Sequence, residues 1–300
     1  MSMILRILTT WISSLMRAGK MFHGFHSTVI GDSHVKKGIV CQDSSGTYVC
    51  DRYAVAVVAD GHGSAKHFRS EVGSQIAVQI TLGLMNKYMR RDNFPEQFKK
   101  HPNFILKQME KQILMKWREA IQAYQSANPF TEEELLKVPE DKRDHINIPT
   151  VYGSTVHVAV MTDEFSFGLV LGDGGFVVLE EDGDAYIPIE DKNSRANYTS
   201  SLCNTNAYKY FEHWYTRERP KAMFVSTDGL FNSFASESDF LKYHGLLAQM
   251  FGNQDRMSRS VKKNFERRTR DGSGDDISIA MVYHTDQTAI TGGDCDEERS

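Results

Sequence analysis

The chain has 300 residues, of which 40% are hydrophobic and 25% are charged. This composition is typical of a globular protein with enough apolar residues to build a sizeable core. The formal net charge of −4 argues against nucleic acid as the main partner, because binding to phosphates needs a surplus of Lys and Arg. The four cysteines form no CxxC pair, which argues against a zinc or redox motif and favours reduced thiols in a cytoplasmic protein.

Residues 1–20 contain an apolar run that Arg6 interrupts. The run is too short and too broken to span a membrane, which takes about 20 apolar residues, so we expect no membrane span. We expect residues 1–20 to form a helix or arm packed on the body of the protein. A weak membrane-surface or partner helix and a signal peptide are the alternatives, in that order.

The first half of the chain predicts one buried strand followed by two long helices. Residues 53–61, YAVAVVADG, are short, apolar and rich in valine, as in a buried strand. Two later segments carry apolar residues at intervals of four, which predicts amphipathic helices. They are residues 70–90, with Val72, Ile76, Ile80 and Leu84, and residues 103–124, with Ile105, Met109, Ile113, Trp117 and Ile121.

A short third helix and a loop follow. Thr131 and Glu134 have the spacing of a capping box, which marks the start of a helix. The stretch 137–149 is polar and broken by two prolines, so we expect a surface loop there.

The second half of the chain predicts mostly strands. Period-two alternation over residues 154–162, 165–174 and 176–189 predicts a meander, with a DG turn inside the last piece. Residues 192–215 show no clear period and predict a partly ordered excursion. The segments after it predict, in order, a strand, two helices and a final strand: 221–231, 238–251, 256–270 and 275–285.

Strands therefore cluster at both ends of the chain around a helical middle, without regular βαβ alternation. This order predicts one α+β domain in which helices cover antiparallel sheets. We place the domain at residues 21–286, after the arm of residues 1–20 and before a polar, fraying tail of residues 287–300.

Three apolar runs end in an acid and a glycine: VVADG at Asp60, LVLGDG at Asp173 and FVSTDG at Asp228. Any one of them is explained as a turn, because Asp and Gly are both turn formers. Their recurrence favours a shared site, since the strands of one sheet can deliver their ends to a common edge. Asp275 also lies directly before an apolar strand, and Asp43 follows a basic turn.

Several carboxylates at one point repel each other unless a cation neutralises them. Hard oxygen ligands select Mg²⁺ or Mn²⁺ over zinc, and the sequence has no clustered set of His and Cys. The acid pattern therefore predicts a site for divalent cations at the end of a sheet.

The order of these motifs, QD … VVADGHGS … GST … LGDG … VSTDGLFN … GDDISIAMV, resembles the metal-dependent Ser/Thr protein phosphatases of the 2C type in their bacterial-like form. The motifs are collinear from about residue 30 to residue 283, which is nearly the whole chain. Each motif alone is weak, but six in order are a specific signal. The resemblance implies a four-layer α/β/β/α sandwich of two antiparallel sheets flanked by helices.

The resemblance also implies a function, which is hydrolysis of phosphoserine and phosphothreonine in proteins by a hydroxide that bridges two Mn²⁺ or Mg²⁺ ions. Such ions, about 4 Å apart, lower the pKa of a bridging water and hold the phosphoryl oxygens for in-line attack. Asp60 would bridge the ions, the Gly61 carbonyl would join one of them, and Asp228 and Asp275 would complete the other. Asp43 would hold metal-bound water. A cognate Ser/Thr kinase in the same signalling circuit is the expected partner.

His62 would be the general acid that protonates the leaving alkoxide. An imidazole that titrates near neutrality suits that role. The alternative is a turn histidine that only fills space. Its place between two glycines, directly after the Asp60 motif, favours the catalytic role.

The sequence departs from the family pattern near the site. Gly38 stands where the family commonly has a phosphate-gripping arginine. Lys37 beside it can supply charge but not a bidentate fork, so a phosphate clamp and a solvated basic turn are both open. Gln42 replaces a frequent glutamate, which removes a negative charge near the metals, and Gly174 replaces the usual serine. Asp173 would help to hold a third, weaker ion.

A second acid commonly completes that third site, four residues after the Asp228 position, where this chain has Asn232. Whether a third ion binds is therefore open.

Two other functions stay open beside an active protein phosphatase. One is a pseudophosphatase or phosphoprotein-binding module on the same fold, motivated by the missing arginine and by Gln42. The other is a phosphatase of a small phosphate ester, because substrate choice depends on loops such as residues 190–215. The aromatic residues there either grip a peptide or form a small core of their own, and we prefer the small core. They are Tyr198, Tyr208, Tyr210, Phe211, Trp214 and Tyr215.

Overall fold

The computed structural model describes residues 20–189 and 199–286. Nearly all of the predicted arm (1–20) and the whole predicted tail (287–300) lie outside the described residues, as does part of the 192–215 excursion. The two domain boundaries therefore stay predictions. Within the described ranges, no helix has the length and apolar character needed to cross a bilayer.

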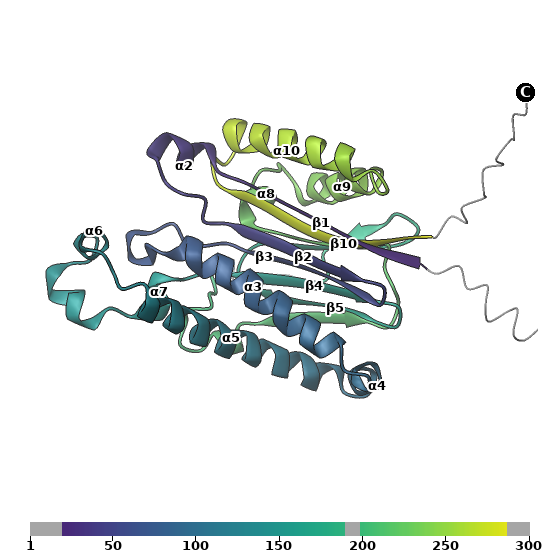
Figure 1. Cartoon of the computed structure of the whole chain (residues 1–300). Coiled ribbons are helices and arrows are strands. Elements are labelled where there is room, and N and C mark those ends of the chain that lie inside the picture. Colours follow the sequence, from purple (N-terminus) through teal and green to yellow (C-terminus); the bar gives the residue numbers. More distant parts are fainter. Residues whose placement is uncertain (1–19, 190–198, 287–300) are drawn as a thin grey trace, which may run out of the picture.

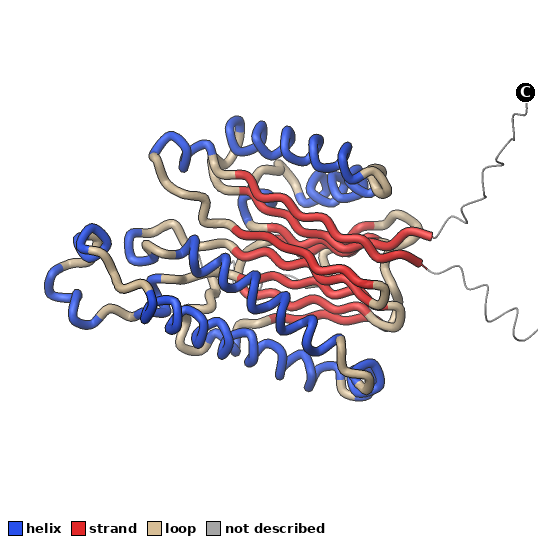
Figure 2. The backbone as a smooth tube through the Cα atoms, in the orientation of Figure 1, coloured by secondary structure: helices blue, strands red, loops and turns tan. Residues whose placement is uncertain are grey.

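Two antiparallel sheets of five strands each lie face to face between layers of helices (Figures 1 and 2). Sheet I has the strand order β1 (Lys20–Val29), β10 (Ile277–Asp286), β9 (Ala222–Ser226), β6 (Gly175–Leu179) and β7 (Ala185–Tyr186). Sheet II has the order β2 (Ser44–Cys50), β3 (Tyr53–Ala59), β4 (Val156–Thr162), β5 (Ser166–Leu171) and β8 (Glu212–Thr216). The four-layer sandwich is confirmed.

Long helices cover the outer faces of both sheets (Figure 1). Sheet II carries α3 (Ser70–Met89), α4 (Phe94–Lys100) and α5 (Pro102–Ala127), and sheet I carries α9 (Glu237–Ala248) and α10 (Gln254–Asp271). The connections contain the short helices α2 (Asp32–Lys37), α6 (Glu132–Leu136), α7 (Ile148–Val151) and α8 (Asp228–Phe231). They also contain single 3-10 turns at Ala65–His67, Glu140–His145 and Ala207–Lys209, the second of which lies in the predicted surface loop.

The unbroken apolar run of β3 follows from its position between two cores. Alternate side chains of a strand point to opposite faces of the sheet. One set enters the core between sheet II and its helices, and the other set enters the core between the two sheets. The first set is Tyr53, Val55 and Val57, and the second is Ala54, Ala56 and Val58.

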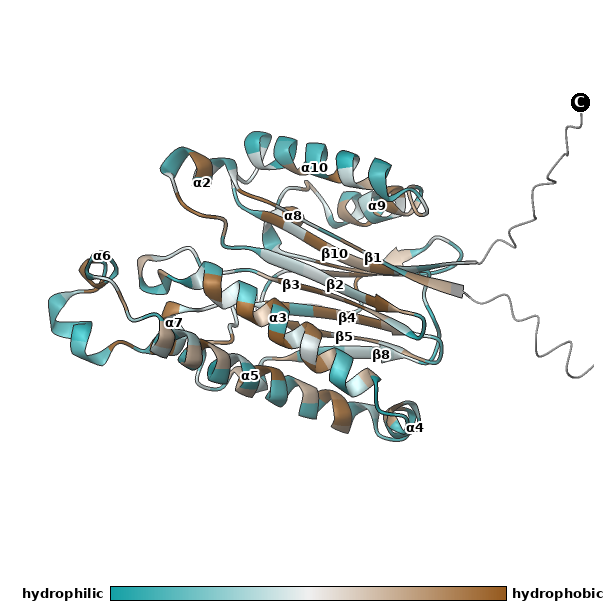
Figure 3. Cartoon of the chain, viewed as in Figure 1, coloured by the Kyte–Doolittle hydropathy of each residue, from teal (hydrophilic) through white to brown (hydrophobic). Residues whose placement is uncertain are grey.

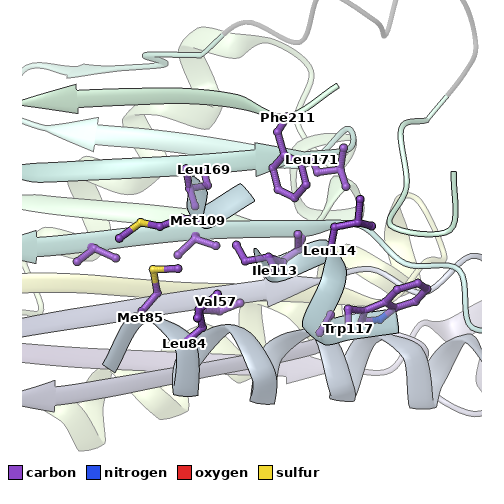
Figure 4. Close-up of a cluster of buried hydrophobic side chains, with 14 of the residues drawn as sticks. Val57, Leu84, Met85, Met109, Ile113, Leu114, Trp117, Leu169, Leu171 and Phe211 are labelled. Atoms are coloured by element: carbon purple, nitrogen blue, oxygen red, sulfur yellow. The ribbon is translucent and has the colours of Figure 1, made fainter. Parts of the chain in front are cut away.

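The predicted apolar stripe of the second long helix is confirmed in α5. Met109, Ile113, Trp117 and Ile121 are each at most 1% exposed, and Figure 4 shows the first three packed with side chains of α3 and sheet II. The Trp117 Nε1 group donates a hydrogen bond of 3.0 Å to the Gly73 carbonyl oxygen, which ties α5 to α3. This satisfies the one polar group of a buried indole.

The buried side of α3 differs from the predicted stripe. Small residues, Gly73, Ser74, Ala77 and Thr81, are buried together with Leu84, while Val72, Ile76 and Ile80 are only half-buried. A Cβ atom at Gly73 would lie 1.8 Å from the Tyr152 carbonyl oxygen, so only glycine fits there. Close packing at Gly73 therefore helps to set which face of the first turns of this helix points inward.

The surface helix α10 shows the simplest pattern. Its buried residues recur at intervals of four: Met257, Val261, Phe265 and Thr269. Nearly all of the remaining positions are polar or charged. Figure 3 shows α10 as mostly hydrophilic, above a more hydrophobic sheet. Such a helix gains its stability from one apolar stripe on the core.

The predicted meander over residues 154–189 is wrong in its pairing. β4 and β5 form a hairpin in sheet II, but β6 pairs with β7 and β9 in sheet I. The chain crosses between the sheets at the LGDGG segment, where Gly172 has a φ of +112° that side chains rarely allow. β5 and β6 are buried throughout, so their residues do not show which sheet each strand joins.

The excursion of residues 192–215 is more ordered, where it is described, than the sequence predicts. β8 adds an edge strand to sheet II by pairing with β5. Phe211 lies in the core between sheet II and its helices, and the Trp214 ring packs edge-on against Phe176 at 5.9 Å between centroids. The separate aromatic core is thus wrong for the described residues, and Tyr198 lies outside them.

Arg69 fastens the start of α3 to the region around α6. Its Nε and Nη2 groups donate to the two carboxylate oxygens of Glu134 at 2.6 and 2.7 Å. The guanidinium also donates to the carbonyl oxygens of Asn128 and Pro129 and to the hydroxyl oxygen of Tyr152. The side chain of Arg69 is 8% exposed, so these bonds are largely shielded from water. They hold several connections of the chain in one arrangement.

Replacing Glu134 with Gln is expected to destabilise the protein by about 1–2 kcal/mol at pH 7, because a charge-assisted pair is lost. The hydrogen bond from Arg69 lowers the pKa of Glu134 to about 2. A lowered pKa in the folded state contributes stability above the ordinary value near 4.5, and this contribution disappears as the pH falls towards 2. Denaturant unfolding at pH 7 and pH 3 should show the two proteins converging at the lower pH.

The exposed neighbour Glu133 offers the matched control for that measurement. Glu133→Gln should leave the unfolding free energy nearly unchanged at both pH values. The confirmed capping box of Thr131 and Glu134 is untouched in that variant, and Gln can take the place of Glu in a capping box in the Glu134→Gln variant. An equal effect of the two substitutions would contradict a specific role of the Arg69 pair.

Candidate active site

Antiparallel pairing in sheet II places two of the predicted acids side by side. Asp60 directly follows β3 and Asp43 directly precedes β2, and these strand ends are neighbours because Ala59 pairs with Ser44. The glycine after Asp60 is required by close packing, since a Cβ atom at Gly61 would lie 2.6 Å from the Ser70 carbonyl oxygen. The Asp60–Gly61 backbone is therefore rigidly placed at the end of the sheet.

Antiparallel pairing also brings two acids together in sheet I. Asp228 lies at the start of α8, just after β9, and Asp275 lies just before β10. The two strand ends are adjacent because Ser226 pairs with Ile279. Each sheet thus delivers a pair of acids to the same end of the sandwich.

A hydrogen bond links the two pairs across the sheets. Thr227 Oγ1, from sheet I, donates to Asp43 Oδ2, from sheet II, at 2.7 Å, and the Ser278 backbone N–H donates to Thr227 Oγ1 at 2.9 Å. Asp43 and Thr227 are both buried, so this contact fixes Asp43 in position.

The acids are close enough to change one another's ionisation. Burial raises the pKa of Asp60 well above its ordinary range, and the charges of Asp43 and Asp228 raise it further. Burial likewise raises the pKa of Asp43 well above its ordinary range. The pKa of Asp228 rises to about 6, first because of burial and then because of the charge of Asp173. The raised pKa values of Asp60 and Asp228 both favour the protonated carboxyl, and each has other acids close to it.

This donor set fits hard divalent cations. The acids retain protons at a pH at which an isolated Asp is ionised, and a bound cation would displace those protons and take the oxygen atoms as ligands. Oxygen donors suit Mg²⁺ or Mn²⁺. Among the described residues, however, no three His, Cys, Asp or Glu side chains already converge as the ligands of one ion. The individual metal roles of Asp43, Asp60, Gly61, Asp173, Asp228 and Asp275 therefore stay predictions.

A pocket of about 290 Å³ opens beside Asp60. It contains three of the predicted site residues, Asp60, Gly61 and Asp275. It also contains Gln42, which was predicted to lie near the metals. The rest of the lining had no predicted role and is strongly polar: Ser33, His34, Gly63, Ser273 and Asp276.

Asp275 and Asp276 are adjacent in sequence but have different surroundings. Asp276 is 3% exposed, and its carboxylate accepts hydrogen bonds from the backbone N–H groups of Gly31 and Gln42, both at 2.6 Å, and from His34 Nδ1 at 2.9 Å. The Asp275 side chain is 51% exposed. Asp276 therefore fixes the loops around the pocket. Asp275 Oδ1 accepts from the Asp276 backbone N–H at 2.9 Å, but the exposure of its side chain leaves it accessible to a ligand.

His62 directly follows Gly61 in the chain. Its backbone N–H donates to the Gly153 carbonyl oxygen at 3.1 Å, and its ring centroid lies 4.8 Å from that of His67. A Cβ atom at Gly153 would lie 2.8 Å from the His62 ring, so the glycine leaves room for it. The pKa of His62 is lowered to about 4, first by burial and then by the His67 charge, while the Asp173 charge opposes the shift. The imidazole is consequently neutral at pH 7.

The family model for protein phosphatase 2C matches residues 30–266. The chain belongs to the protein phosphatase 2C family. As a member of this family it is a metal-dependent serine/threonine protein phosphatase. No curated protein matches its sequence.

Solved structures of 2C-type phosphatases share the fold. A bacterial serine phosphatase has 14% identity and a TM-score of 0.55, over 89% of this chain and all of that chain. The catalytic domain of PstP, in complex with 2 manganese ions, has 13% identity and a TM-score of 0.52, over 89% of this chain and 100% of that chain. A serine/threonine phosphatase of S. agalactiae has 14% identity and a TM-score of 0.53, over 87% and 99%. These identities support a common fold.

The departures from the 2C pattern have structural counterparts. Asn232 Nδ2 donates to Asp228 Oδ2 at 3.1 Å, so an amide stabilises the acid where a second carboxylate would repel it. Thr199 Oγ1 donates to Asp173 Oδ2 at 2.6 Å. A Cβ atom at Gly174 would lie 2.3 Å from the His157 ring, which explains why a serine does not fit there.

The region of the missing 2C arginine is a short helix and not the predicted basic turn. Gly38 ends α2 with a φ of +66°, a left-handed conformation that glycine adopts readily. Lys37 is exposed and is not among the described residues that line the Asp60 pocket. Lys36 pairs with Asp32 within the helix at 2.5 Å. The position of Lys37 therefore does not support the phosphate-clamp role, which stays a prediction.

Proposed function

We propose that this phosphatase removes phosphate from phosphoserine and phosphothreonine in proteins at the acid-lined end of the sandwich, with two Mn²⁺ or Mg²⁺ ions. The observation that carries the proposal is the convergence of Asp43, Asp60 and Asp228 from the two sheets, where burial and the charges of neighbouring acids raise the pKa of each. Buried acids without a counter-charge destabilise a fold, and carboxyl groups with strongly raised pKa values cluster at functional sites, so a bound cation accounts for this arrangement. When bound, the ions would lower the pKa of water and cancel charge on the phosphoryl oxygens.

The acids of this chain divide into ligands and supports. Asp60 and Asp228 lie at the meeting point of the two sheets, and Asp275 is exposed beside them, so these three are best placed to contact ions, with the Gly61 carbonyl. Asp43 is buried and already accepts from Thr227, which suits an acid that orients bound water. Asp173 lies near Asp228 and would contribute to any third ion.

His62 would donate a proton to the leaving serine or threonine oxygen. A neutral imidazole cannot do so, and its pKa of about 4 must therefore rise in the complex. The dianionic phosphate of the substrate supplies the negative charge that would raise it, since opposite charge favours the protonated form.

Replacing His62 with Gln is expected to slow hydrolysis of a phosphothreonine peptide by about 100-fold or more, the usual contribution of a general acid. Hydrolysis of p-nitrophenyl phosphate should slow far less, because nitrophenolate leaves without being protonated. Steady-state kcat on both substrates measures the difference. His145→Gln, at an exposed histidine, is the matched control. Equal losses on the two substrates would indicate that His62 only positions the loop.

The function itself is tested by a phosphatase assay with and without chelator, in Mn²⁺ and in Mg²⁺. Release of phosphate from phosphopeptides that stops with chelator and returns with either ion is the expected result. Uptake of ions without phosphate release would favour the phosphoprotein-binding module, and activity confined to small esters would favour a metabolite phosphatase. A Ser/Thr kinase in the same circuit and a cytoplasmic location are the surroundings that we propose for it.

A further inference from the structure

A second pocket, of about 410 Å³, lies next to the acids. It is enclosed by the hairpin of β6 and β7 and by α8 and α9. Asp173 lines this pocket, and so does Phe231 of α8, the helix whose first residue is Asp228, so the pocket adjoins the proposed reacting centre. The wall is largely apolar, with Phe176, Ile187, Ile189, Phe231 and Leu241.

The pocket combines this apolar wall with negative charge. Glu237, the first residue of α9, is exposed at its rim, and Asp173 supplies a second carboxylate. Among the described residues that line the pocket there is no Lys or Arg. The pocket thus offers both apolar surface and the carboxylate of Glu237, which has no Lys or Arg beside it among the described lining residues.

This combination matches a long basic side chain. Lys and Arg bury an aliphatic stem against apolar surface while the charged head stays at the rim. The more accessible aromatic rings of the lining, those of Tyr186 and Phe231, also attract a guanidinium group that lies over them. A purely apolar side chain would pack against the wall but would not pair with the Glu237 carboxylate. An acidic side chain would be repelled by that carboxylate.

We propose that this pocket binds an arginine or lysine side chain of the phosphoprotein substrate, close in sequence to the phosphorylated residue. The inference rests on the proposed function, because it takes the acids beside Asp173 as the place of reaction. Phe231 and Asp228 are the last and first residues of α8, so the pocket and the reacting centre share one short element. A peptide whose phosphate lies at the acids would therefore have its flanking residues within reach of Glu237.

The test uses phosphothreonine peptides with alanine at the flanking positions, in which a single Arg is moved through each flanking position in turn. Arg at one favoured position should raise kcat/KM about tenfold over the alanine peptide, as expected for a partly desolvated ion pair with an aromatic contact. Glu237→Gln should remove most of this gain, and Glu237→Lys should replace it with a preference for Glu. p-Nitrophenyl phosphate, which has no flanking residue, should be hydrolysed equally by all three proteins.

Two further variants separate the pocket from general effects. Leu241→Ala shortens the wall and should reduce the Arg preference by about threefold, the loss expected for part of one buried side chain. Glu266→Gln removes an exposed carboxylate of α10 and should leave the preference intact. Unchanged thermal unfolding of each variant shows that the fold survives.

The outcomes distinguish the pocket from the reaction. No positional preference for Arg, a preference for Leu over Arg, or a preference that survives Glu237→Gln would overturn the proposal even while p-nitrophenyl phosphate is hydrolysed. If no substrate is hydrolysed, the proposed function fails, and the pocket is then tested by the affinities of the same labelled peptides in fluorescence anisotropy. Tighter binding of the Arg peptide that is lost with Glu237→Gln would support the pocket, and equal affinities would overturn it.

Discussion

Asp60→Asn should reduce kcat/KM for phosphopeptides by about a thousandfold or more, the scale on which removal of a central charged group acts in hydrolytic sites. Asn keeps the shape of the side chain but removes the charge that two divalent cations would share. The same substitution should not unfold the protein. Asp60 is crowded by the charges of Asp43, Asp228 and Asp275, so the loss of its charge relieves repulsion when metal is absent.

The measurement pairs phosphate release with thermal unfolding in chelator. The metal-free Asp60→Asn protein should melt at or above the temperature of the unaltered protein at pH 7.5, although it is inactive. Asp184→Asn, in the exposed turn between β6 and β7, is the matched control and should retain full activity. A variant that is inactive because it has unfolded, or one that keeps its activity in chelator, would contradict the role of Asp60.

The residues of the site were predictable because the signal is local. An acid and a glycine after an apolar run mark a strand end, and antiparallel neighbours then bring Asp60 beside Asp43 and Asp228 beside Asp275. Each strand end can be predicted separately from the local sequence. The stacking of the two sheets with these ends together cannot, and only the resemblance to a family predicted that arrangement.

Other parts of the site had no local signal. Asp276 precedes β10 just as Asp275 does, but Asp276 turns inward to accept from Gly31, Gln42 and His34. These donors are more than 200 residues away in the chain, with separations of 245, 234 and 242. The local sequence around Asp275 and Asp276 cannot show which of these two adjacent acids has hydrogen-bond partners far away in the chain.

The errors in the fold have the same origin. β1 was not predicted, because His23, Gly24 and His26 break its apolar alternation, and it exists as a strand through its pairing with β10 at the far end of the chain. The meander failed because β6 pairs with β9 and not with β5. Local pattern predicts that a segment is extended, whereas its partner depends on residues that lie far away.

Divalent cations are expected to stabilise the protein strongly, and to do so in a pH-dependent way. A cation at one hundred times its dissociation constant adds about 2.7 kcal/mol, which for a domain of this size corresponds to a rise of about 5–10 °C in Tm. The cation must replace the protons that Asp43, Asp60 and Asp228 hold in its absence. Its effect should therefore be small at pH 5 and large at pH 7.5.

The raised pKa values determine how the stability of the metal-free protein changes with pH. Asp228 has a pKa of about 6 in the folded protein, above its ordinary value of 3.8, so its protonated form is the one that folding favours. Its contribution to metal-free stability is complete below 3.8 and is lost as the pH rises through 6. The metal-free Tm should fall between pH 5 and pH 7.5, and added Mn²⁺ should reverse that fall. Scanning calorimetry in chelator and in Mn²⁺, with Asp60→Asn as the variant that responds weakly, measures both effects. A Tm rise of equal size at the two pH values would show that the ions bind somewhere other than among these acids.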